Sequence, residues 1–540
     1  MEKLTLLSLI ILFVSTSAQT SPSAQYWAKT YGGNSYDSAY SIQQTIDGGF
    51  IVAGQTSSFG SGGLDSWILK LDRNGNLSWQ KTYGETEWDS FTSIQQTLDG
   101  GYIMAGYIGY PLPPEKMPIL KNEDVSTCSG IWVVKLTDSG NVFWQNCYGM
   151  TEVDKPTAIN QTSDGGYILV GNTHYTSFTD IWVLKLDSNG NISWQKSYGG
   201  NKSDSAYSIQ QTKDGGYVVA GKTDLAASSS SDFLVLKLDN SGNVSWQKIY
   251  KVSVFGSVHS CSIQQTADEG YILAGDAGEP LNNVDIYLLK LSSNGDIIWQ
   301  KTYRESDWDD EAYFSSIQQT SDGGYILAGI VVNNAGYKNT SDDLWLLKLD
   351  IDGNLIWRNV YDVSYSDSMY SAQQTSDGGY ILAADTLGAG YKDILIMKLD
   401  SNGEIPFCDI VSNSTVIVSD TDMDFEDSTV TVQSTSATIT ETNIIPQDSL
   451  AEITTICGGV GPCLVERIYG EYSEGTKIIR NFRNDVLSQT LIGQELISLY
   501  YQWSPTIVKA MEEDEEFKEQ VKKLTDTILL LLNERLDVSN

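Results

Sequence analysis

An aromatic residue followed directly by aspartate stands at three similar places, Tyr36-Asp37, Trp88-Asp89 and Trp308-Asp309. An aromatic ring beside a carboxylate suits the recognition of sugars or peptides, because the ring offers apolar contact area and the carboxylate accepts hydrogen bonds. These six residues are the candidate ligand-binding residues. The alternative is that the rings only pack one structural unit against the next, since tryptophan is commonly largely buried.

The residues needed for common kinds of catalysis are scarce. The chain holds two histidines, His174 and His259, and lacks a Gly-x-Ser-x-Gly nucleophile turn. No group of histidines or cysteines has the spacing of metal ligands. Acid–base chemistry by aspartates and tyrosines is an open alternative, but without distances no pair can be singled out. The sequence therefore predicts no catalytic residue, no metal ligand and no cofactor.

Two segments imitate known binding motifs. Residues 216–223, Gly-Tyr-Val-Val-Ala-Gly-Lys-Thr, match the phosphate-loop pattern. That motif requires a glycine-rich loop before a helix, whereas this apolar segment and its sister copy at 50–56 predict a strand. Residues 187–191, Asp-Ser-Asn-Gly-Asn, resemble the start of a calcium loop but lack the closing glutamate. An Asx-type hairpin turn is predicted there instead.

The elements that must position these residues come from a repeat. Seven copies of one unit lie between Ser41 and Asp400, each with a Gln-Gln-Thr segment, an Asp-Gly-Gly turn, an apolar run, Leu-Lys-Leu-Asp, Asn-Gly-Asn and Trp-Gln-Lys, or close variants of these. A period of roughly 50 to 65 residues is typical of propeller blades. The glycine pairs or equivalents that mark the copies are 48–49, 100–101, 165–166, 215–216, 269–270, 323–324 and 378–379.

Each copy predicts four antiparallel strands, and seven copies predict an all-β seven-bladed β-propeller over residues 24–400. An open stack of sheets is the competing arrangement. The last copy lacks an outer strand, whereas an unpaired outer strand, Trp27–Tyr31, precedes the first copy. We expect this N-terminal strand to complete blade seven, because closure leaves no long exposed sheet edge. The Gln-Gln-Thr strand should be innermost, with the variable loops and blade connections on one face.

A lysine recurs inside the third strand of every copy, and a covered lysine needs a partner. The predicted partners are the aspartates that precede the inner strands. They are Asp37, Asp89, Asp154, Asp204 and Asp367.

The segments outside the repeats have distinct compositions. Residues 1–18 combine Lys3, an apolar stretch and small residues, which predicts a cleavable secretory signal. Residues 401–462 are rich in Ser, Thr and Val, which predicts a β-rich stalk or a strand pair laid against the ring. Residues 463–540 have helical spacing, and their apolar run is too short to span a membrane.

The net charge limits the kinds of partner that the chain can bind, and the cysteines limit its possible disulfides. The 34 basic and 69 acidic residues give a net charge of −35, which repels nucleic acid and anionic lipid. Six cysteines in an exported chain can form disulfides. The predicted pairs are Cys128 with Cys147 and Cys408 with Cys457, leaving Cys261 and Cys463 unassigned.

Two parts of the chain resemble known families. The repeat array over about 27–400, with its Asp-Gly-Gly-Tyr-Ile-x-Ala-Gly units, resembles exported bacterial and archaeal β-propeller repeat proteins, which implies location more than activity. The tail resembles the CFI-box C-terminal module in Cys463, Arg480-Asn481-Phe482-Arg483-Asn484 and Ser504-Pro505. Its opening, Leu464 to Ile468, departs from the Phe-Ile-Ala-Thr-Ala of that module. This resemblance implies a role in envelope attachment or assembly.

Three functional hypotheses follow. The leading one is an exported or cell-surface, non-enzymatic protein that recognises a surface glycan or a protein through the variable-loop face. The second is an extracellular polysaccharide hydrolase or lyase that uses channel-facing carboxylates. The third is a purely structural envelope protein held by its tail.

Overall fold

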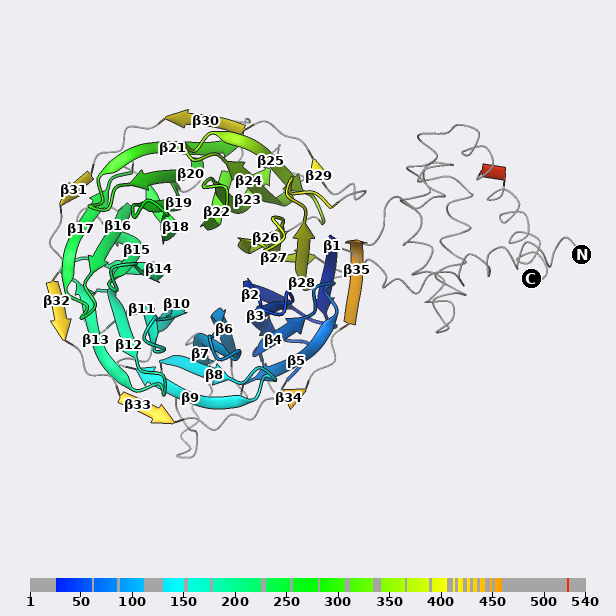
Figure 1. The fold of residues 1–540 in the computed structure, drawn as a ribbon, viewed down its shortest axis with the longest axis horizontal. Coiled ribbons are helices and arrows are strands. Elements are labelled where there is room, and N and C mark those ends of the chain that lie inside the picture. The colour runs from blue at the N-terminus through cyan, green and yellow to red at the C-terminus, as the bar shows by residue number, and fades with distance from the viewer. Residues whose placement is uncertain are drawn as a thin grey trace, which may run out of the picture. The chain divides into compact units, whose positions relative to one another are not determined.

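The computed structural model describes residues 26–405 apart from short gaps, backbone segments between 411 and 458, and residues 522–523. The gaps within 26–405 are 61–62, 85–87, 111–129, 150–153, 175–177, 225–229, 253–255, 280–281, 306–310, 334–340, 365–366 and 388–390. Seven sheets stand in a ring in the unit formed by 27–405 and 409–456 (Figure 1).

The seven sheets are the blades, and each has four strands that follow one another in space. Blades 1 to 4 consist of β2 (Asp37–Gln44), β3 (Phe50–Thr56), β4 (Asp65–Leu71), β5 (Leu77–Tyr83); β6 (Trp88–Gln96), β7 (Tyr102–Tyr110), β8 (Ile131–Leu136), β9 (Val142–Gly149); β10 (Lys155–Gln161), β11 (Tyr167–Thr173), β12 (Asp180–Leu186), β13 (Ile192–Gly199); and β14 (Asp204–Gln211), β15 (Tyr217–Asp224), β16 (Ser231–Leu238), β17 (Val244–Tyr250).

Blades 5 to 7 repeat this arrangement, and the last takes its outer strand from the N-terminal side. They consist of β18 (Ser257–Gln265), β19 (Tyr271–Glu279), β20 (Asn282–Leu291), β21 (Ile297–Glu305); β22 (Glu311–Gln319), β23 (Tyr325–Asn333), β24 (Ser341–Leu349), β25 (Leu355–Tyr361); and β26 (Ser368–Gln374), β27 (Tyr380–Leu387), β28 (Lys392–Leu399), β1 (Trp27–Gly32). The predicted seven-bladed propeller is confirmed.

The core lies between neighbouring blades. The middle strands are apolar at consecutive positions, and in β3 and β4 nearly every residue is buried, because both faces of each sheet are covered by the adjacent blades. The outer strand β5 is less buried: only Thr82 and Tyr83 are buried, Ser78 is exposed and the other residues are half-buried. This pattern leaves two surfaces. We call the face where inner strands begin and middle strands are joined by variable loops the connection face, and the opposite face, with the hairpin turns, the turn face.

The N-terminal strand closes the ring as predicted. β1 pairs antiparallel with β28, with Trp27 opposite Lys398 and Tyr31 opposite Ile394. Tyr31 also donates a 2.6 Å hydrogen bond to the carbonyl of Gly75 in blade 1. The equivalent tyrosine makes the same bond to the next blade at each of the six remaining junctions. These tyrosines are Tyr83, Tyr148, Tyr198, Tyr250, Tyr303 and Tyr361.

The same junctions explain the Asn-Gly-Asn turn of the repeat. Gly75 has φ +73°, and a Cβ at this position would lie 2.7 Å from the indole of Trp27. Only glycine fits there, because the turn needs a positive φ and the ring of the preceding blade packs on it.

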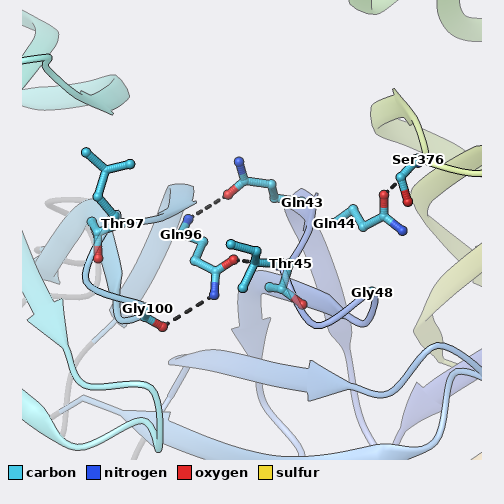
Figure 2. A pocket seen from close by; sticks show the side chains of 10 residues that line it. Gln43, Gln44, Thr45, Gly48, Gln96, Thr97, Gly100 and Ser376 are labelled. Atoms are coloured by element: carbon cyan, nitrogen blue, oxygen red, sulfur yellow. Dashed lines mark hydrogen bonds between the residues drawn. The ribbon is translucent and has the colours of Figure 1, made fainter.

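Glutamine side chains form a ring of hydrogen bonds that links each blade to the next on the turn face, and Figure 2 shows the part of it around Gln44 and Gln96. The last glutamine of each inner strand, such as Gln96, accepts the backbone N–H of the preceding blade's hairpin turn, here Ile46, at 2.8 Å. The bond from Ser376 to Gln44 closes the ring from blade 7 to blade 1. The other five donors are Leu98, Ser163, Lys213, Ala267 and Ser321.

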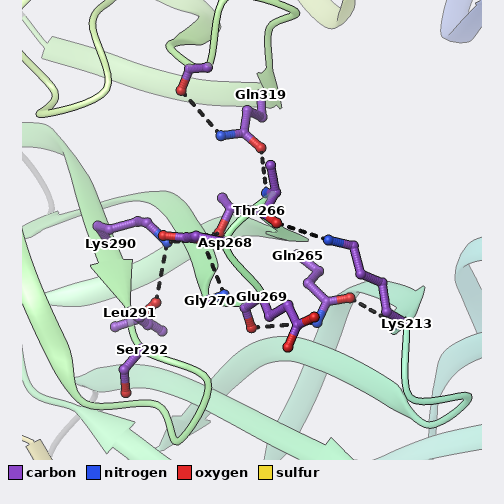
Figure 3. A network of polar contacts seen from close by, with 12 residues as sticks. Lys213, Gln265, Thr266, Asp268, Glu269, Gly270, Lys290, Leu291, Ser292 and Gln319 are labelled. Carbon is purple, nitrogen blue, oxygen red and sulfur yellow. Dashed lines mark hydrogen bonds and ion pairs between the residues drawn. The ribbon is translucent and has the colours of Figure 1, made fainter.

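The third-strand lysines do not pair with the predicted aspartates. Each pairs instead with the aspartate of its own blade's Asp-Gly-Gly turn, as Lys290 does with Asp268 at 2.9 Å (Figure 3). The remaining pairs are Lys70–Asp47, Lys135–Asp99, Lys185–Asp164, Lys237–Asp214, Lys348–Asp322 and Lys398–Asp377. The prediction is wrong because each lysine lies beside the turn of its own blade. The aspartate that shapes this turn is therefore also the ion-pair partner of the lysine.

Seven short strands between residues 411 and 458 form a belt, which is the main feature that the sequence did not predict. The belt adds a fifth strand to the outer edge of every blade and runs backward around the ring, from blade 6 through blade 1 to blade 7 (Figure 1). Its strands are β29 (Val411–Ser412), β30 (Val416–Asp420), β31 (Phe425–Asp427), β32 (Thr431–Ser434), β33 (Thr438–Glu441), β34 (Gln447–Asp448) and β35 (Glu452–Gly458). The segment is therefore β-rich, but it is neither a stalk nor a single strand pair.

Other predictions lie partly outside the described residues. The secretory signal at 1–18 does so entirely, and only 522–523 of the helical tail are described. Within the described residues, no helix has the length and apolar character that a membrane span requires. Cys147 is disulfide-bonded, but Cys128 and Cys408 lie outside the described residues, so both predicted pairings stay predictions. Cys261 is buried and free.

The two imitation motifs are structural, as predicted. The phosphate-loop look-alike lies in strand β15. In the calcium-loop look-alike, Asp187 Oδ1 accepts the backbone N–H groups of Asn189 and Asn191 at 2.8 Å, which is an Asx-type turn.

Candidate functional site

Exposed aromatic side chains stand on the connection face of the described chain. They are Tyr36, Trp88, Phe178 and Tyr391. Exposed apolar side chains in the hairpin turns of the opposite face, such as Ile46 and Leu98, are aliphatic. Flat amphipathic rings are suited to recognition because they offer a large contact area and lose little conformational entropy. The connection face is therefore the candidate binding surface.

Two of these aromatic residues form a pair at the junction of blades 7 and 1. The Tyr36 and Tyr391 rings lie 5.5 Å apart between centroids at 82°, which is an edge-to-face contact. Tyr36 is 53% exposed and Tyr391 46% exposed. Tyr36 belongs to the connection from β1 to β2, and Tyr391 directly precedes β28. Ring closure thus brings together two residues that are far apart in the sequence.

The loop that carries Tyr36 is fixed from below by Asp37. This carboxylate is fully buried. It accepts hydrogen bonds from the Ser58 hydroxyl at 2.7 Å and the Gly33 backbone N–H at 2.9 Å, and a further short one from Thr56. Burial raises the pKa of Asp37, and these hydrogen bonds oppose that rise. Asp37 therefore holds the connection in place beneath the surface that Tyr36 presents.

A second aromatic pair lies between the same two blades. Tyr40 of β2 and Tyr370 of β26 make an edge-to-face contact with centroids 5.1 Å apart. Beside them, the buried carboxyl of Asp385 in β27 accepts the Ala39 backbone N–H at 3.0 Å. Burial raises the pKa of Asp385 to about 7. This junction therefore combines four tyrosines with a carboxyl group that is partly protonated near neutral pH.

The remaining predicted site residues are placed as follows. Trp88 begins β6 and is 40% exposed, in the position of blade 2 that Tyr36 holds in blade 1. Asp89 is fully buried and its backbone N–H bonds to Leu64 of blade 1. Trp308 and Asp309 lie outside the described residues. Ligand binding by all of these residues stays a prediction.

A hollow of about 510 Å³ lies on the turn face, between blades 7, 1 and 2 (Figure 2). Gln43, Gln44 and Gln96 line it, and their amide oxygens are occupied by the ring of inter-blade hydrogen bonds. Its lining has no charged side chain. The hollow is the space that these blade-to-blade hydrogen bonds enclose.

Several residues of the candidate site were missed in the sequence. Tyr391 lies in the loop before the third strand of blade 7. Its one signal is that ring closure brings this loop next to Tyr36. Asp385 occupies the repeat position that Asn172 holds in blade 3, where the amide oxygen accepts the Ala206 N–H at 2.8 Å. Aligning the copies at this position would have shown a carboxylate in place of an amide.

No protein-family model matches the sequence, and no curated protein is significantly similar to it. Among solved structures, similarity extends to a Dyadobacter fermentans protein of unknown function (13% identity, TM-score 0.39, 70% of this chain and 99% of that one). The polysaccharide lyase Uly1 gives 11% identity and a TM-score of 0.42 over 72% and 95% of the two chains. The Penicillium chrysogenum α-L-arabinanase gives 11% and 0.37 over 71% and 99%. At these values the similarities say nothing about the activity of this chain.

Proposed function

We propose that this chain is an exported glycan-binding propeller that recognises a sugar chain through the Tyr36–Tyr391 pair on its connection face. The observation that carries the proposal is an exposed edge-to-face tyrosine pair held by two rigid blades. One face of a pyranose ring is lined with C–H groups, which pack on an aromatic face, while the phenol hydroxyls can bond to sugar hydroxyls. The net charge of −35 favours neutral glycans over polyanions.

Rigidity supports this assignment. Ser57 fixes the Tyr36 connection, because its hydroxyl accepts the Tyr36 N–H at 3.0 Å and its own N–H donates to the Tyr36 carbonyl at 2.8 Å. A platform that is already ordered loses little entropy when a ligand binds. The envelope location is part of the proposal and depends on the predicted signal and tail.

The test is binding of the full chain to a panel of immobilised neutral glycans, followed by calorimetry on any ligand found. Tyr36→Ala and Tyr391→Ala should each weaken binding about tenfold or more, the size expected for a central aromatic contact. Phe143→Ala is the matched control, because Phe143 is exposed on an outer strand far along the chain from this junction. Equal affinities for all variants would refute the platform, and capture of proteins but no glycan would assign the face to a protein partner.

A further inference from the structure

The inner strand of blade 5 breaks the pattern of its six sisters. In the other blades a β-bulge falls directly before the position shared by Ser41, with Tyr40 as the extra residue in blade 1. In blade 5 this position is paired regularly and the bulge lies at His259, between Val258 and Ser260. A bulge redirects a side chain and is common beside active sites. Here it places an imidazole on the connection face with 37% of its side chain exposed.

The buried partner of this histidine also departs from the repeat. Asp276 occupies the position of Asn172 and Asp385, whose side chains accept an N–H group of the next blade. Asp276 instead turns to its own inner strand. Its Oδ2 lies 3.2 Å from His259 Nδ1, and its Oδ1 accepts a hydrogen bond from Ser260. The Ser260 hydroxyl also contacts the Phe314 carbonyl of blade 6 at 3.1 Å.

Asp276 is therefore available to orient the imidazole. A carboxylate on Nδ1 holds the proton there, so Nε2 carries the free lone pair. Tyr313 of blade 6 lies beside the ring with centroids 6.1 Å apart. Its hydroxyl donates a hydrogen bond to Glu311 Oε2 at 2.6 Å. The Glu311 carboxylate therefore already has a partner. Among the groups just named, His259 Nε2 is the base best placed to exchange protons with a ligand.

We propose that His259 and Asp276 form a general-base pair on the connection face of blades 5 and 6 that hydrolyses carboxylic esters, with acylated neutral sugars as the natural class. Glycoside hydrolysis needs two carboxyl groups flanking the bond, whereas here Asp276 is buried on His259 and Glu311 is engaged by Tyr313. For an ester, one general base can supply the acid–base chemistry, because the imidazolium that forms when water is activated can return its proton to the leaving alcohol oxygen. The site lies at a different junction from the tyrosine platform, and only the choice of acylated sugars as the natural class rests on the proposed glycan binding.

The reaction balances with one water molecule. His259 Nε2 removes a proton from water while the water oxygen attacks the ester carbonyl carbon, giving a tetrahedral adduct. The bond from that carbon to the alcohol oxygen then breaks, and the imidazolium returns its proton to the departing oxygen. The products are a carboxylic acid and a free hydroxyl. Asp276 remains a carboxylate and stabilises the transient imidazolium.

The test is multiple-turnover hydrolysis of 4-nitrophenyl acetate, and acetate release from acetylated xylan, by the full chain. His259→Gln should lower kcat/KM about 100-fold or more, the usual contribution of a general base. His174→Gln is the matched control, because it removes the only other histidine of the chain, and should change the rate less than twofold. Since the small ester contains no sugar, failure of glycan binding would leave this result unaffected.

The pH profile separates a catalytic role from a structural one. For the unaltered chain, kcat/KM should fall toward acidic pH, because a protonated imidazole cannot act as a base, and His259→Gln should lose this limb. The carboxylates nearest the imidazole and Tyr313 are Asp276, Glu311 and Asp342. Equal rates for the unaltered chain and His259→Gln would overturn the proposal. So would a flat profile of the unaltered chain, which decides the question even if the variant fails to fold.

Discussion

At the scale of single residues, Asp385 shows how one position in a repeat can change the pH dependence of the whole fold. It accepts the same inter-blade hydrogen bond that the amide of Asn172 accepts in blade 3. An amide is neutral at every pH, whereas a buried carboxyl resists ionisation. The raised pKa of Asp385, about 7 against an ordinary 3.8, therefore means that the folded state binds this proton more tightly than the unfolded state.

This difference predicts a pH-dependent stability that Asp385→Asn should remove. Because the folded pKa is raised, the free energy of unfolding should fall as pH rises from about 4 to about 7, and stay low above that. The variant keeps the acceptor oxygen and has no ionisable group. It should be more stable than the unaltered chain at pH 8 by a few kcal/mol at most, at about 1.4 kcal/mol per pKa unit, and similar at pH 4. Urea unfolding at the two pH values measures this, and an equal difference at both would contradict it.

At the scale of elements, local patterns predicted the blades well and the belt poorly. Residues only a few positions apart determine strands such as Phe50–Thr56 and the turns around Gly48 and Gly75. The belt strands are two to seven residues long, and each pairs with an outer strand far away in sequence, as β34 does with β5. Alternating Ser, Thr and Val shows that strands form but not which edge they join. The same limit applies to Tyr391, whose partner is set by ring closure.

The belt should protect the propeller from self-association, since it covers the outermost edge of every blade with a further strand. We expect a chain that ends after Ile405 to melt at a lower temperature and to form oligomers through its uncovered outer strands. The matched control ends after Gly458, which keeps the belt and removes only the tail. Light scattering and thermal unfolding distinguish the two chains. Identical behaviour would show that the belt strands add neither stability nor edge protection.

At the scale of the whole molecule, the repeat predicted closure because it showed a missing strand at one end and a spare one at the other. The closed ring makes the seven junctions nearly equivalent, and their links recur in register. Both proposed functions lie where the copies differ. The Tyr36–Tyr391 pair joins the two ends of the ring, and the His259 bulge occurs in one inner strand. Neither could be predicted from a single copy, because each depends on contacts between blades.

Equivalence of the junctions gives a direct test of closure. Tyr31 and Tyr83 are both fully buried, and their hydroxyls donate to Gly75 and Gly140 at 2.6 and 2.7 Å. The Tyr83 bond joins blades that are consecutive in the chain, whereas the Tyr31 bond joins the N-terminal strand, which completes blade 7, to blade 1. In a closed ring, Tyr31→Phe and Tyr83→Phe should each cost about 1 to 2 kcal/mol, because each leaves a buried carbonyl without its donor. Chemical denaturation measures both. If the ring opened at the junction of blades 7 and 1, Tyr31→Phe would cost nothing while Tyr83→Phe kept its full effect.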